Sequence, residues 1–453
     1  MPELSSDIAE AITKAVSDSF DQQIAYTQKL IQFGGQRGDE TEIQEFIFQQ
    51  FADKGWNPVK FDMDEEALKA HVGAGKFSPT HSRAPIVVGV HKPETTKGKS
   101  LILNGHIDVV PTGPADMWAR DPYSGHIEGD YIYGRGGGDM KGGHASILWA
   151  MSALHRAGVQ PAAEVIIESV VEEESTGNGT LMTHLKGYKA DAVLIPEPVQ
   201  EKLVRANVGV LWFQVEVRGR PTHVREMANG VNAIDACWKV VGTLRELEED
   251  WNKRNIGKLY FEKEPHPLSK LSPRRTPKVE QSRQAQIDKI HSTDLNVAIV
   301  NGGDWASSVP SWCRFDCRIA IAPGVSAKSA ADEIEKKVTD FARADAFLSK
   351  NPPKLTWNGF FSEGYVLEPG TEAEELLRKA HQKVTGQELQ YQTSTAYLDA
   401  RVHTLYDRIP ALVYGPVSSN IHGVDEWVSI ESLKRTTTAI ALFIAEWCGV
   451  ESI

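Results

Sequence analysis

Hydrophobic positions follow two different spacings along the first half of the chain. Residues 7 to 55 carry apolar side chains at the spacing of amphipathic helices, with a break at Gly34-Gly35 and a restart after Asp39. Short apolar runs bounded by Gly, Pro or Asp then occur at 85–90, 100–104, 165–171, 192–195 and 411–414. Because helical stretches such as 141–156 separate several of these runs, we predict an α/β fold with a mainly parallel sheet covered by helices on both faces.

The middle of the chain has another order of elements. The pattern predicts, in turn, a strand at 211–217, a helix at 231–250, strands at 295–300 and 313–321, a helix at 327–347 and a strand at 355–357. This is the order of a split βαβ sandwich. We therefore predict a smaller α+β domain at 209–362, inserted into a discontinuous domain made of 1–208 and 363–453. Trp238 is expected in the core, on the apolar side of its helix.

Composition and charge narrow the class of protein. The 453 residues are 41% hydrophobic and 24% charged, which is typical of a soluble protein with substantial cores. A net charge of -12 argues against a nucleic-acid-binding surface. No run approaches the ~18 apolar residues of a membrane span, and no signal peptide is visible, so a cytoplasmic location is expected. A segment at 253–290, rich in Lys, Arg and Pro, is interpreted as an inserted loop without assigned function.

Acidic residues and histidines gather where the predicted strands end. His106, Glu174, Glu197 and His422 each lie at or just beyond such an end, and Asp139 lies in the glycine-rich segment GRGGGDMKGG. That segment cannot be a phosphate-binding loop, because Asp139 or Met140 falls where glycine is required. On its own, the acidic triplet 172–174 would be interpreted as a solvated turn. The His106-Ile-Asp108 motif alone is common and would not indicate a function.

Together, the two histidines and three carboxylates suit a pair of zinc-like ions, with Asp139 able to offer one oxygen to each. Glu173 lies next to a ligand and stays free to take a proton, which suits a general base. The set predicts a hydrolase.

Several of these segments also resemble a known family. NGHIDVVPTG, GRGGGDMKGG, EEEST, IPEP and IHGVDEWV resemble the co-catalytic zinc enzymes that include acetylornithine deacetylase, succinyl-diaminopimelate desuccinylase, aminoacylase-1 and glutamate carboxypeptidase. The resemblance runs from about residue 25 to the end of the chain. It implies two divalent ions per subunit, zinc or substituting cobalt, and a hydroxide between them as the nucleophile.

The resemblance also implies a role for each residue. His106 and Glu197 would bind one ion, Glu174 and His422 the other, and Asp139 would bridge them. Asp108 would orient His106, and Glu173 would be the general base.

The inserted domain resembles the lid and dimerisation domain of that family. In GRPTHVREMANGVNAID, His223 would reach the active site of a partner subunit and stabilise the oxyanion, and Asn232 would contact the substrate. The active enzyme would then be a homodimer. Arg401, in Asp399-Ala400-Arg401, is the preferred anchor for a substrate carboxylate. Arg318 is a second candidate, with a surface arginine on a strand as the alternative.

The function that this resemblance implies is hydrolysis of the amide bond of an N-acyl amino acid. A dipeptidase or carboxypeptidase would use the same centre on a short peptide and is the alternative. A non-catalytic binding protein on the same fold is a remote alternative, because all five ligands and Glu173 are present. Neither nucleic acid nor a membrane is expected as a partner.

Overall fold

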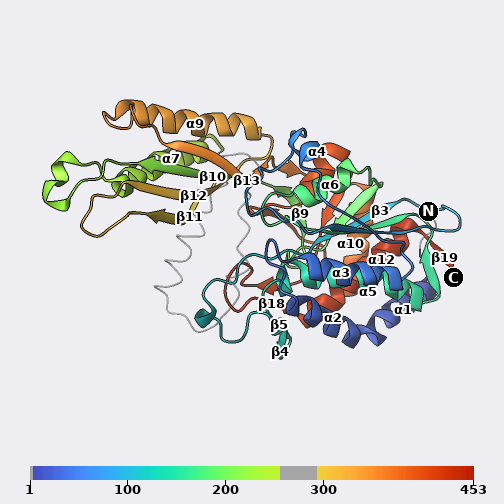
Figure 1. Cartoon of the computed structure of the whole chain (residues 1–453). Coiled ribbons are helices and arrows are strands. Elements are labelled where there is room, and N and C mark those ends of the chain that lie inside the picture. The colour runs from blue at the N-terminus through green and yellow to red at the C-terminus, as the bar shows by residue number, and fades with distance from the viewer. Residues whose placement is uncertain (1–3, 256–292) are drawn as a thin grey trace, which may run out of the picture. The chain divides into compact units, whose positions relative to one another are not determined.

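The computed structural model describes residues 4–255 and 293–453. The chain separates into two compact units (Figure 1). Unit 1 consists of Met1–Arg205, Val366–Gln392 and Leu398–Ile453, and unit 2 of Ala206–Tyr365 and Thr393–Tyr397. Except for its first three residues, the basic segment 253–290 lies outside the described residues. Each unit is described by itself.

Unit 1 is built on a six-stranded sheet ordered β1-β2-β7-β3-β8-β16. The strands are β1 (Val59–Phe61), β2 (Ile86–His91), β7 (Val165–Val170), β3 (Leu101–His106), β8 (Ala192–Ile195) and β16 (Ala411–Val413). The last four are mutually parallel, whereas β1 and β2 pair antiparallel at one edge. The predicted, mainly parallel sheet is confirmed.

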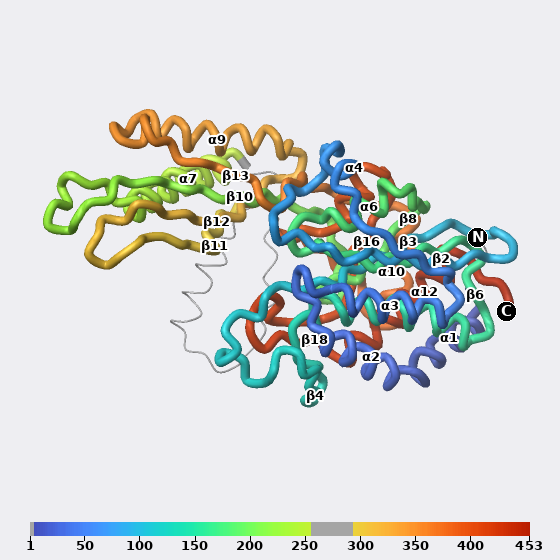
Figure 2. Tube along the Cα trace, viewed as in Figure 1, coloured from blue at the N-terminus to red at the C-terminus, as the bar shows by residue number. Residues whose placement is uncertain are grey.

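Helices cover both faces of this sheet (Figures 1 and 2). Consecutive residues of a strand point to opposite faces, and β3 shows which helices lie on each. A Cβ on Gly105 would lie 3.3 Å from His144 of α5 (Gly142–Arg156), whereas Asn104 donates to Thr180 of α6 (Asn178–Leu185). Unit 1 also contains α4 (Glu65–Lys69), which contacts α6, and α10 (Glu372–Thr385), α11 (Ala400–Val402) and α12 (Ile430–Cys448), of which α10 contacts α12.

The N-terminal helices extend the face that α5 covers. They are α1 (Ser6–Asp18), α2 (Phe20–Gln32) and α3 (Thr41–Asp53). Buried Gln23 of α2 donates to Thr437 of α12 and Ser146 of α5, so these three helices share one polar contact. The predicted break near Gly34-Gly35 is present, but a second break at Ser19 was not predicted. There the Ser19 hydroxyl donates to the Ala15 carbonyl, a local bond that competes with helix continuation.

Three smaller sheets are formed by strands that belong neither to this central sheet nor to the four-stranded sheet of unit 2. Their strands are β17 (Ser418–Ser419), β18 (Trp427–Ser429), β5 (Tyr131–Tyr133) and β4 (His126–Glu128) in one sheet; β19 (Val450–Ser452) and β6 (Val159–Pro161) in another; and β14 (Tyr365–Val366), β9 (Leu203–Asn207) and β15 (Tyr391–Ser394) in the third. In the third sheet the chain passes between the two units. No helix of the described residues is long and apolar enough to cross a bilayer.

Unit 2 has the predicted α+β order. Its antiparallel sheet is ordered β11-β12-β10-β13, with β10 (Gly209–Arg218), β11 (Leu295–Gly302), β12 (Trp312–Ile321) and β13 (Lys354–Ser362). Alternate residues of β10 are fully buried, from Leu211 through Phe213 and Val215 to Val217. They pack into one core with α7 (Ala233–Asn255) and α9 (Ala327–Ala344). The residues between them at the far end of the strand, Gln214, Glu216 and Arg218, are polar and partly or fully exposed, so the helices cover one face of this sheet.

Trp238 is not in this core. Its side chain is 54% exposed, whereas Cys237, Leu244 and Leu247 of the same helix are buried. Successive helical residues are turned by about 100°. Trp238 therefore lies outside the narrow stripe that faces the sheet, and the prediction of a core tryptophan was wrong.

Candidate metal centre

The predicted ligands lie where parallel strands of unit 1 end. His106 is the last residue of β3, Glu173 and Glu174 follow β7, and Glu197 follows β8. His422 lies in the segment after β16. Because these strands are parallel neighbours, their carboxyl ends meet at one edge of the sheet.

A glycine-rich turn brings Asp139 to the same edge. Gly136 has φ +79°, a left-handed conformation that favours glycine. A Cβ on Gly143 would lie only 2.0 Å from the Pro196 carbonyl oxygen, so a side chain at this position would collide with the segment that carries Glu197. These glycines let the backbone of the turn, and that of the first residues of α5, approach the end of β8 closely.

Asp139 lies between the two histidines. Its Oδ1 is 3.1 Å from Nε2 of His106, and its Oδ2 is 3.4 Å from Nε2 of His422. Nε2 of His422 is 3.0 Å from Oε2 of Glu174, and Nε2 of His106 is 3.7 Å from Oε1 of Glu197. The two oxygens of one carboxylate thus face two separate sets of side chains.

These atoms fit a pair of cations. His106, Asp139 and Glu197 form one group, and Asp139, Glu174 and His422 a second, with the ligand atoms of each group within 4.8 Å of one another. Oε1 of Glu197 is buried and has no hydrogen-bond partner among the described residues. A buried carboxylate oxygen without a donor is costly unless a cation or proton satisfies it. The donor set of imidazole and carboxylate suits zinc and similar divalent ions.

The electrostatics of the cluster agree with this interpretation. Burial raises the pKa of Glu173, Glu174 and Glu197, which also repel one another. The Glu174 carboxylate raises the pKa of His422 to about 11. Burial lowers the pKa of His106, but the facing Glu197 and Glu173 outweigh it and hold the pKa well above its usual value. Positive charge is therefore strongly favoured between these carboxylates.

Asp108 supports the centre differently from the prediction. Nδ1 of His106 donates to the main-chain oxygen of Asp108 at 2.9 Å, whereas the carboxylate is 3.6 Å away. A carbonyl can only accept, so this contact places the proton on Nδ1 and leaves Nε2 free for a metal. The Asp108 carboxylate instead accepts the backbone N–H groups of Glu173 and Glu174 at 3.3 and 3.1 Å. Its backbone orients the histidine, and its side chain holds the acidic turn.

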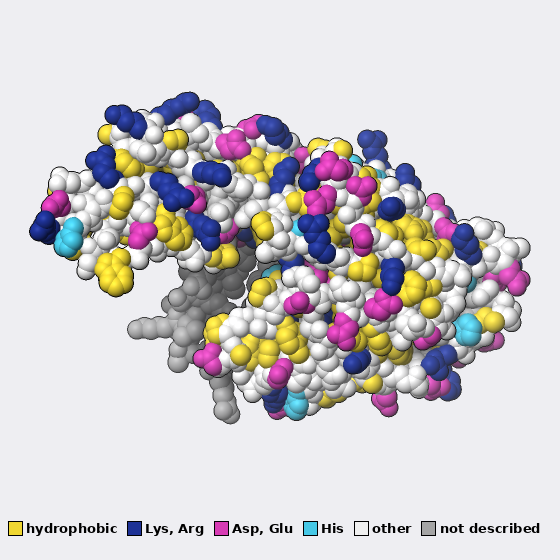
Figure 3. Space-filling view, in the orientation of Figure 1, with side chains coloured by type: hydrophobic (Ala, Val, Ile, Leu, Met, Phe, Trp, Pro, Cys, Tyr) yellow, Lys and Arg dark blue, Asp and Glu magenta, His cyan; other side chains and the backbone are white. Residues whose placement is uncertain are grey.

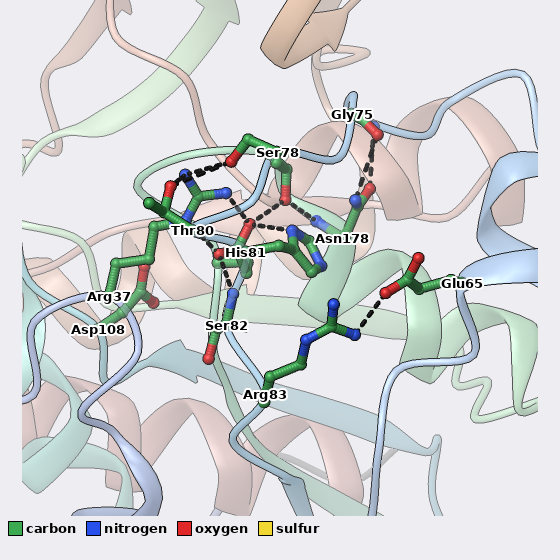
Figure 4. Close-up of polar contacts among 12 residues, drawn as sticks. Arg37, Glu65, Gly75, Ser78, Thr80, His81, Ser82, Arg83, Asp108 and Asn178 are labelled. Carbon is green, nitrogen blue, oxygen red and sulfur yellow. Dashed lines mark hydrogen bonds and ion pairs between the residues drawn. The ribbon is translucent and has the colours of Figure 1, made fainter.

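Glu172 has a role that the sequence did not reveal. Its buried carboxylate pairs with the Arg37 guanidinium and lies 2.9 Å from Nδ1 of His81, neither of which is a candidate ligand. It also accepts the backbone N–H of Ser82 at 2.8 Å. Figure 4 shows Arg37, His81 and Ser82 gathered in this cluster, where Arg37 also contacts Ser78 and Thr80. The first residue of the acidic triplet is thus an anchor for the turn that carries Glu173 and Glu174.

The remaining candidates of unit 2 lie as follows. His223 is exposed, and its Nδ1 accepts the backbone N–H of Arg225. Oδ1 of Asn232 accepts the N–H groups of Ile234 and Asp235 and so caps α7. Arg318 is partly buried in β12 and donates to the Thr395 carbonyl at 2.5 Å. It is therefore not a freely exposed surface arginine.

Arg401 is more enclosed than a substrate anchor would need to be. Its side chain lies in unit 1 and only 1% of the residue is exposed. The guanidinium donates to the Gly73 carbonyl at 2.7 Å and to the Tyr406 hydroxyl at 3.3 Å. A substrate carboxylate would have to reach a guanidinium that the surrounding residues enclose.

Comparisons with known proteins agree with this centre. The sequence profile of peptidase family M20/M25/M40 matches residues 102–446. The N-formyl-4-amino-5-aminomethyl-2-methylpyrimidine deformylase of Halalkalibacterium halodurans is 28% identical over 384 residues, which are 80% of this chain and 83% of the deformylase.

Two solved structures have the same fold. One is the dipeptidase Dug1p from Saccharomyces cerevisiae, with a TM-score of 0.73 at 16% identity over 98% of this chain and 99% of that one. The other is YXEP of Bacillus subtilis, a dinuclear metal-binding peptidase, with a TM-score of 0.52 at 13% identity over 94% and 98%.

The family profile spans all five candidate ligands and most of the chain. The family resemblance drawn from the sequence motifs is thereby confirmed, and the protein is an enzyme of the hydrolase class. The chain belongs to peptidase family M20/M25/M40.

Proposed function

We propose that this enzyme hydrolyses the amide bond of an N-acyl amino acid, with two divalent metal ions at the centre. The observation that carries the proposal is the pair of overlapping ligand groups that share Asp139, with the carboxyl group of Glu173 beside them. The deformylase relative, by its name, removes a formyl group from an amine, and this supports a deacylase rather than a peptidase.

The residues divide between the two ions. His106, Asp139 and Glu197 would hold one, and Asp139, Glu174 and His422 the other. We propose zinc at both positions, with cobalt as a substitute. When bound, such ions polarise an amide carbonyl and lower the pKa of water towards neutrality.

Glu173 is the proposed general base. Its Oε2 lies 3.8 Å from Nε2 of His106, the residue is 6% exposed, and burial holds its pKa well above the usual value. A carboxyl group with a raised pKa can accept a proton near neutral pH and release it again. Glu173 would take a proton from the attacking water as its oxygen bonds to the carbonyl carbon. It would then deliver that proton to the nitrogen as the C–N bond breaks, which gives a carboxylic acid and an amine.

We further propose that unit 1 is the catalytic domain and that unit 2 is a lid through which two copies form a homodimer. Strand β11 is an edge of the unit 2 sheet, and its Ile299 and Val300 are 54% and 44% exposed. Trp238 on α7 and Trp305 are also exposed, and Figure 3 shows hydrophobic side chains on the surface of this unit. An unpaired strand edge with exposed apolar residues is suited to pairing with another chain. In such a dimer, His223 would stabilise the oxyanion in the partner's site.

Arg401, Arg318 and Asn232 remain the proposed substrate contacts. A guanidinium binds a carboxylate through two parallel hydrogen bonds, so either arginine could select an amino-acid product. Arg318 and Asn232 belong to unit 2 and Arg401 to unit 1.

The test is a panel of substrates combined with metal analysis of the same preparation. N-acetyl and N-formyl amino acids, an N-formyl amine without a carboxylate, and dipeptides would be compared at equal metal loading. Fastest turnover of N-acyl amino acids is expected. Faster turnover of dipeptides would favour the alternative function, a peptidase. The fold of this chain is also that of a dipeptidase. Two bound ions without cleavage of any amide would contradict both.

A further inference from the structure

A buried ion pair joins the loops that carry Asp139 and His422, although neither of its members is a candidate ligand. Arg135 and Glu426 are 1% and 0% exposed, and Nη1 of Arg135 is 2.5 Å from Oε2 of Glu426. Both residues belong to unit 1, and 291 positions separate them along the chain. The pair therefore fastens two segments that are remote in sequence.

Glu426 holds the backbone at Asp139 and just before it. Its second oxygen, Oε1, accepts the N–H groups of Gly138 at 2.9 Å and of Asp139 itself at 3.1 Å. Its main-chain oxygen accepts the N–H of Gly134 at 2.8 Å. The start of the glycine-rich segment and the backbone at Asp139 are thus bound to one residue of the His422 segment. Glycines give that turn little stiffness of its own.

Arg135 holds the His422 loop from the opposite side. Its Nη2 donates to the carbonyl of Gly423, the residue after His422, at 2.9 Å, and to the carbonyl of Pro111 at 3.2 Å. Asn420, His422 and Asp425 all have positive φ angles, between 52° and 61°. Such conformations are unfavourable for residues with a Cβ and persist only where their surroundings fix them. The guanidinium is one of the contacts that fix this loop.

Net stability is a poor explanation for this pair. A buried ion pair usually adds little to stability over apolar residues of the same volume, because both charges lose their hydration. Its hydrogen bonds, in contrast, have fixed directions, and together they determine how Asp139 lies relative to His422. The two residues contact each other through Oδ2 and Nε2 at 3.4 Å.

We propose that Arg135 and Glu426 are positioning residues that set the metal affinity of the group formed by Asp139, Glu174 and His422. The inference rests on the proposed dinuclear centre. Within the described residues, the side-chain hydrogen bonds of the pair go to Pro111, Gly138, Asp139 and Gly423, and none goes to His106 or Glu197. The ion held by His422 should therefore depend on the pair more strongly than the ion held by His106 and Glu197.

The test is a metal titration of the full-length chain. Arg135→Lys keeps a positive charge beside Glu426 but removes the planar fork that reaches Gly423. Metal-free protein would be dialysed against Zn²⁺ of increasing free concentration, and bound zinc would give two stepwise dissociation constants. Changes in residues that orient metal ligands typically weaken metal binding by about 10- to 100-fold. We expect a loss of this size for one of the two ions and a much smaller loss for the other.

Arg205→Lys is the matched control. Arg205 also pairs with a buried glutamate, Glu374, and donates to a backbone carbonyl, that of Leu367, and within the described residues its side chain makes no hydrogen bond to the ligand loops. This variant should bind both ions as the wild type does. Glu426→Gln is a second probe of the pair, for use if Arg135→Lys does not fold.

The outcomes separate the inference from the proposed function. Equal weakening of both ions, or unchanged binding of both, in a wild type that binds two ions would overturn the role of the pair and leave the dinuclear centre intact. A wild type that binds fewer than two ions would overturn both. Selective loss of one ion in Arg135→Lys, with Arg205→Lys unaffected, would support the inference.

Discussion

Three consecutive glutamates show how local surroundings give one residue type different properties. Glu172 has a positive φ of 68° and turns its carboxylate to Arg37 and His81. Glu173 and Glu174 instead face His106 and His422, respectively. Hydrogen bonds from His81 and Arg37 outweigh burial and lower the pKa of Glu172, whereas burial raises the pKa of the other two. An anchor, a proposed base and a proposed ligand thus follow one another along the chain.

Replacing Glu173 tests the proposed base at this scale. Glu173→Gln keeps the size of the side chain but cannot take a proton. General acid–base groups contribute roughly 10²- to 10⁴-fold to rate, so kcat should fall by at least two orders of magnitude. Zinc content, measured on the same sample, should stay at the wild-type value. A Gln variant with full zinc and near wild-type kcat would exclude this role.

Replacing Glu172 should have a pH-dependent effect on stability. Burial opposes ionisation, but hydrogen bonds from His81 and Arg37 lower the pKa of Glu172 from 4.5 to about 2. A depressed pKa stabilises the fold fully above pH 4.5, and the contribution is lost as the pH falls towards 2. It is on the order of 3 kcal/mol, at 1.36 kcal/mol per unit of pKa.

Urea unfolding of metal-free Glu172→Gln and wild type at several pH values would measure this. The difference in midpoint should be largest at neutral pH and should shrink below pH 4.5. A difference that stays constant down to pH 3 would show that the charge of Glu172 is not the cause.

At the scale of elements, the strands and their ends could be predicted, but the partners of buried charges could not. Apolar runs bounded by turn residues mark β3, β7, β8 and β16, and parallel order brings their ends together. Nothing local indicates that Arg135 meets Glu426, because such pairs form only after distant segments pack. The sequence also does not show whether His106 donates to the carbonyl or to the carboxylate of Asp108, because the backbone geometry decides this.

Helix α7 provides a test of two roles for one residue. Asn232 caps this helix, and loss of such a cap costs about 1 kcal/mol. Asn232→Ala should therefore lower the thermal midpoint of unfolding, whereas Asn232→Asp should largely preserve it. If Asn232 also contacts the substrate, the Asp variant should raise KM despite its stability. An unchanged KM in Asn232→Asp would limit the residue to the cap.

At the scale of the whole molecule, the question is how many chains make one active site. It arises because the candidate metal centre lies in unit 1 and the candidate oxyanion donor in unit 2. Every proposed metal ligand belongs to unit 1, whereas His223, Asn232 and Arg318 belong to unit 2. The exposed apolar residues of unit 2 would be the surface that binds the second copy in the proposed dimer. If His223 acts in a partner's site, association and activity should be lost together.

Ile299→Lys tests this link. A lysine on an exposed strand edge opposes pairing, because its charge would have to be buried. Sedimentation velocity should show a shift from dimer to monomer, and kcat should fall in parallel. Val72→Lys is the control, since Val72 is 79% exposed in unit 1, away from β11 in the chain, and should change neither property. A monomeric Ile299→Lys variant with wild-type kcat would show that one chain suffices and that His223 of a partner is not needed. A variant that stays dimeric would place the interface elsewhere than β11.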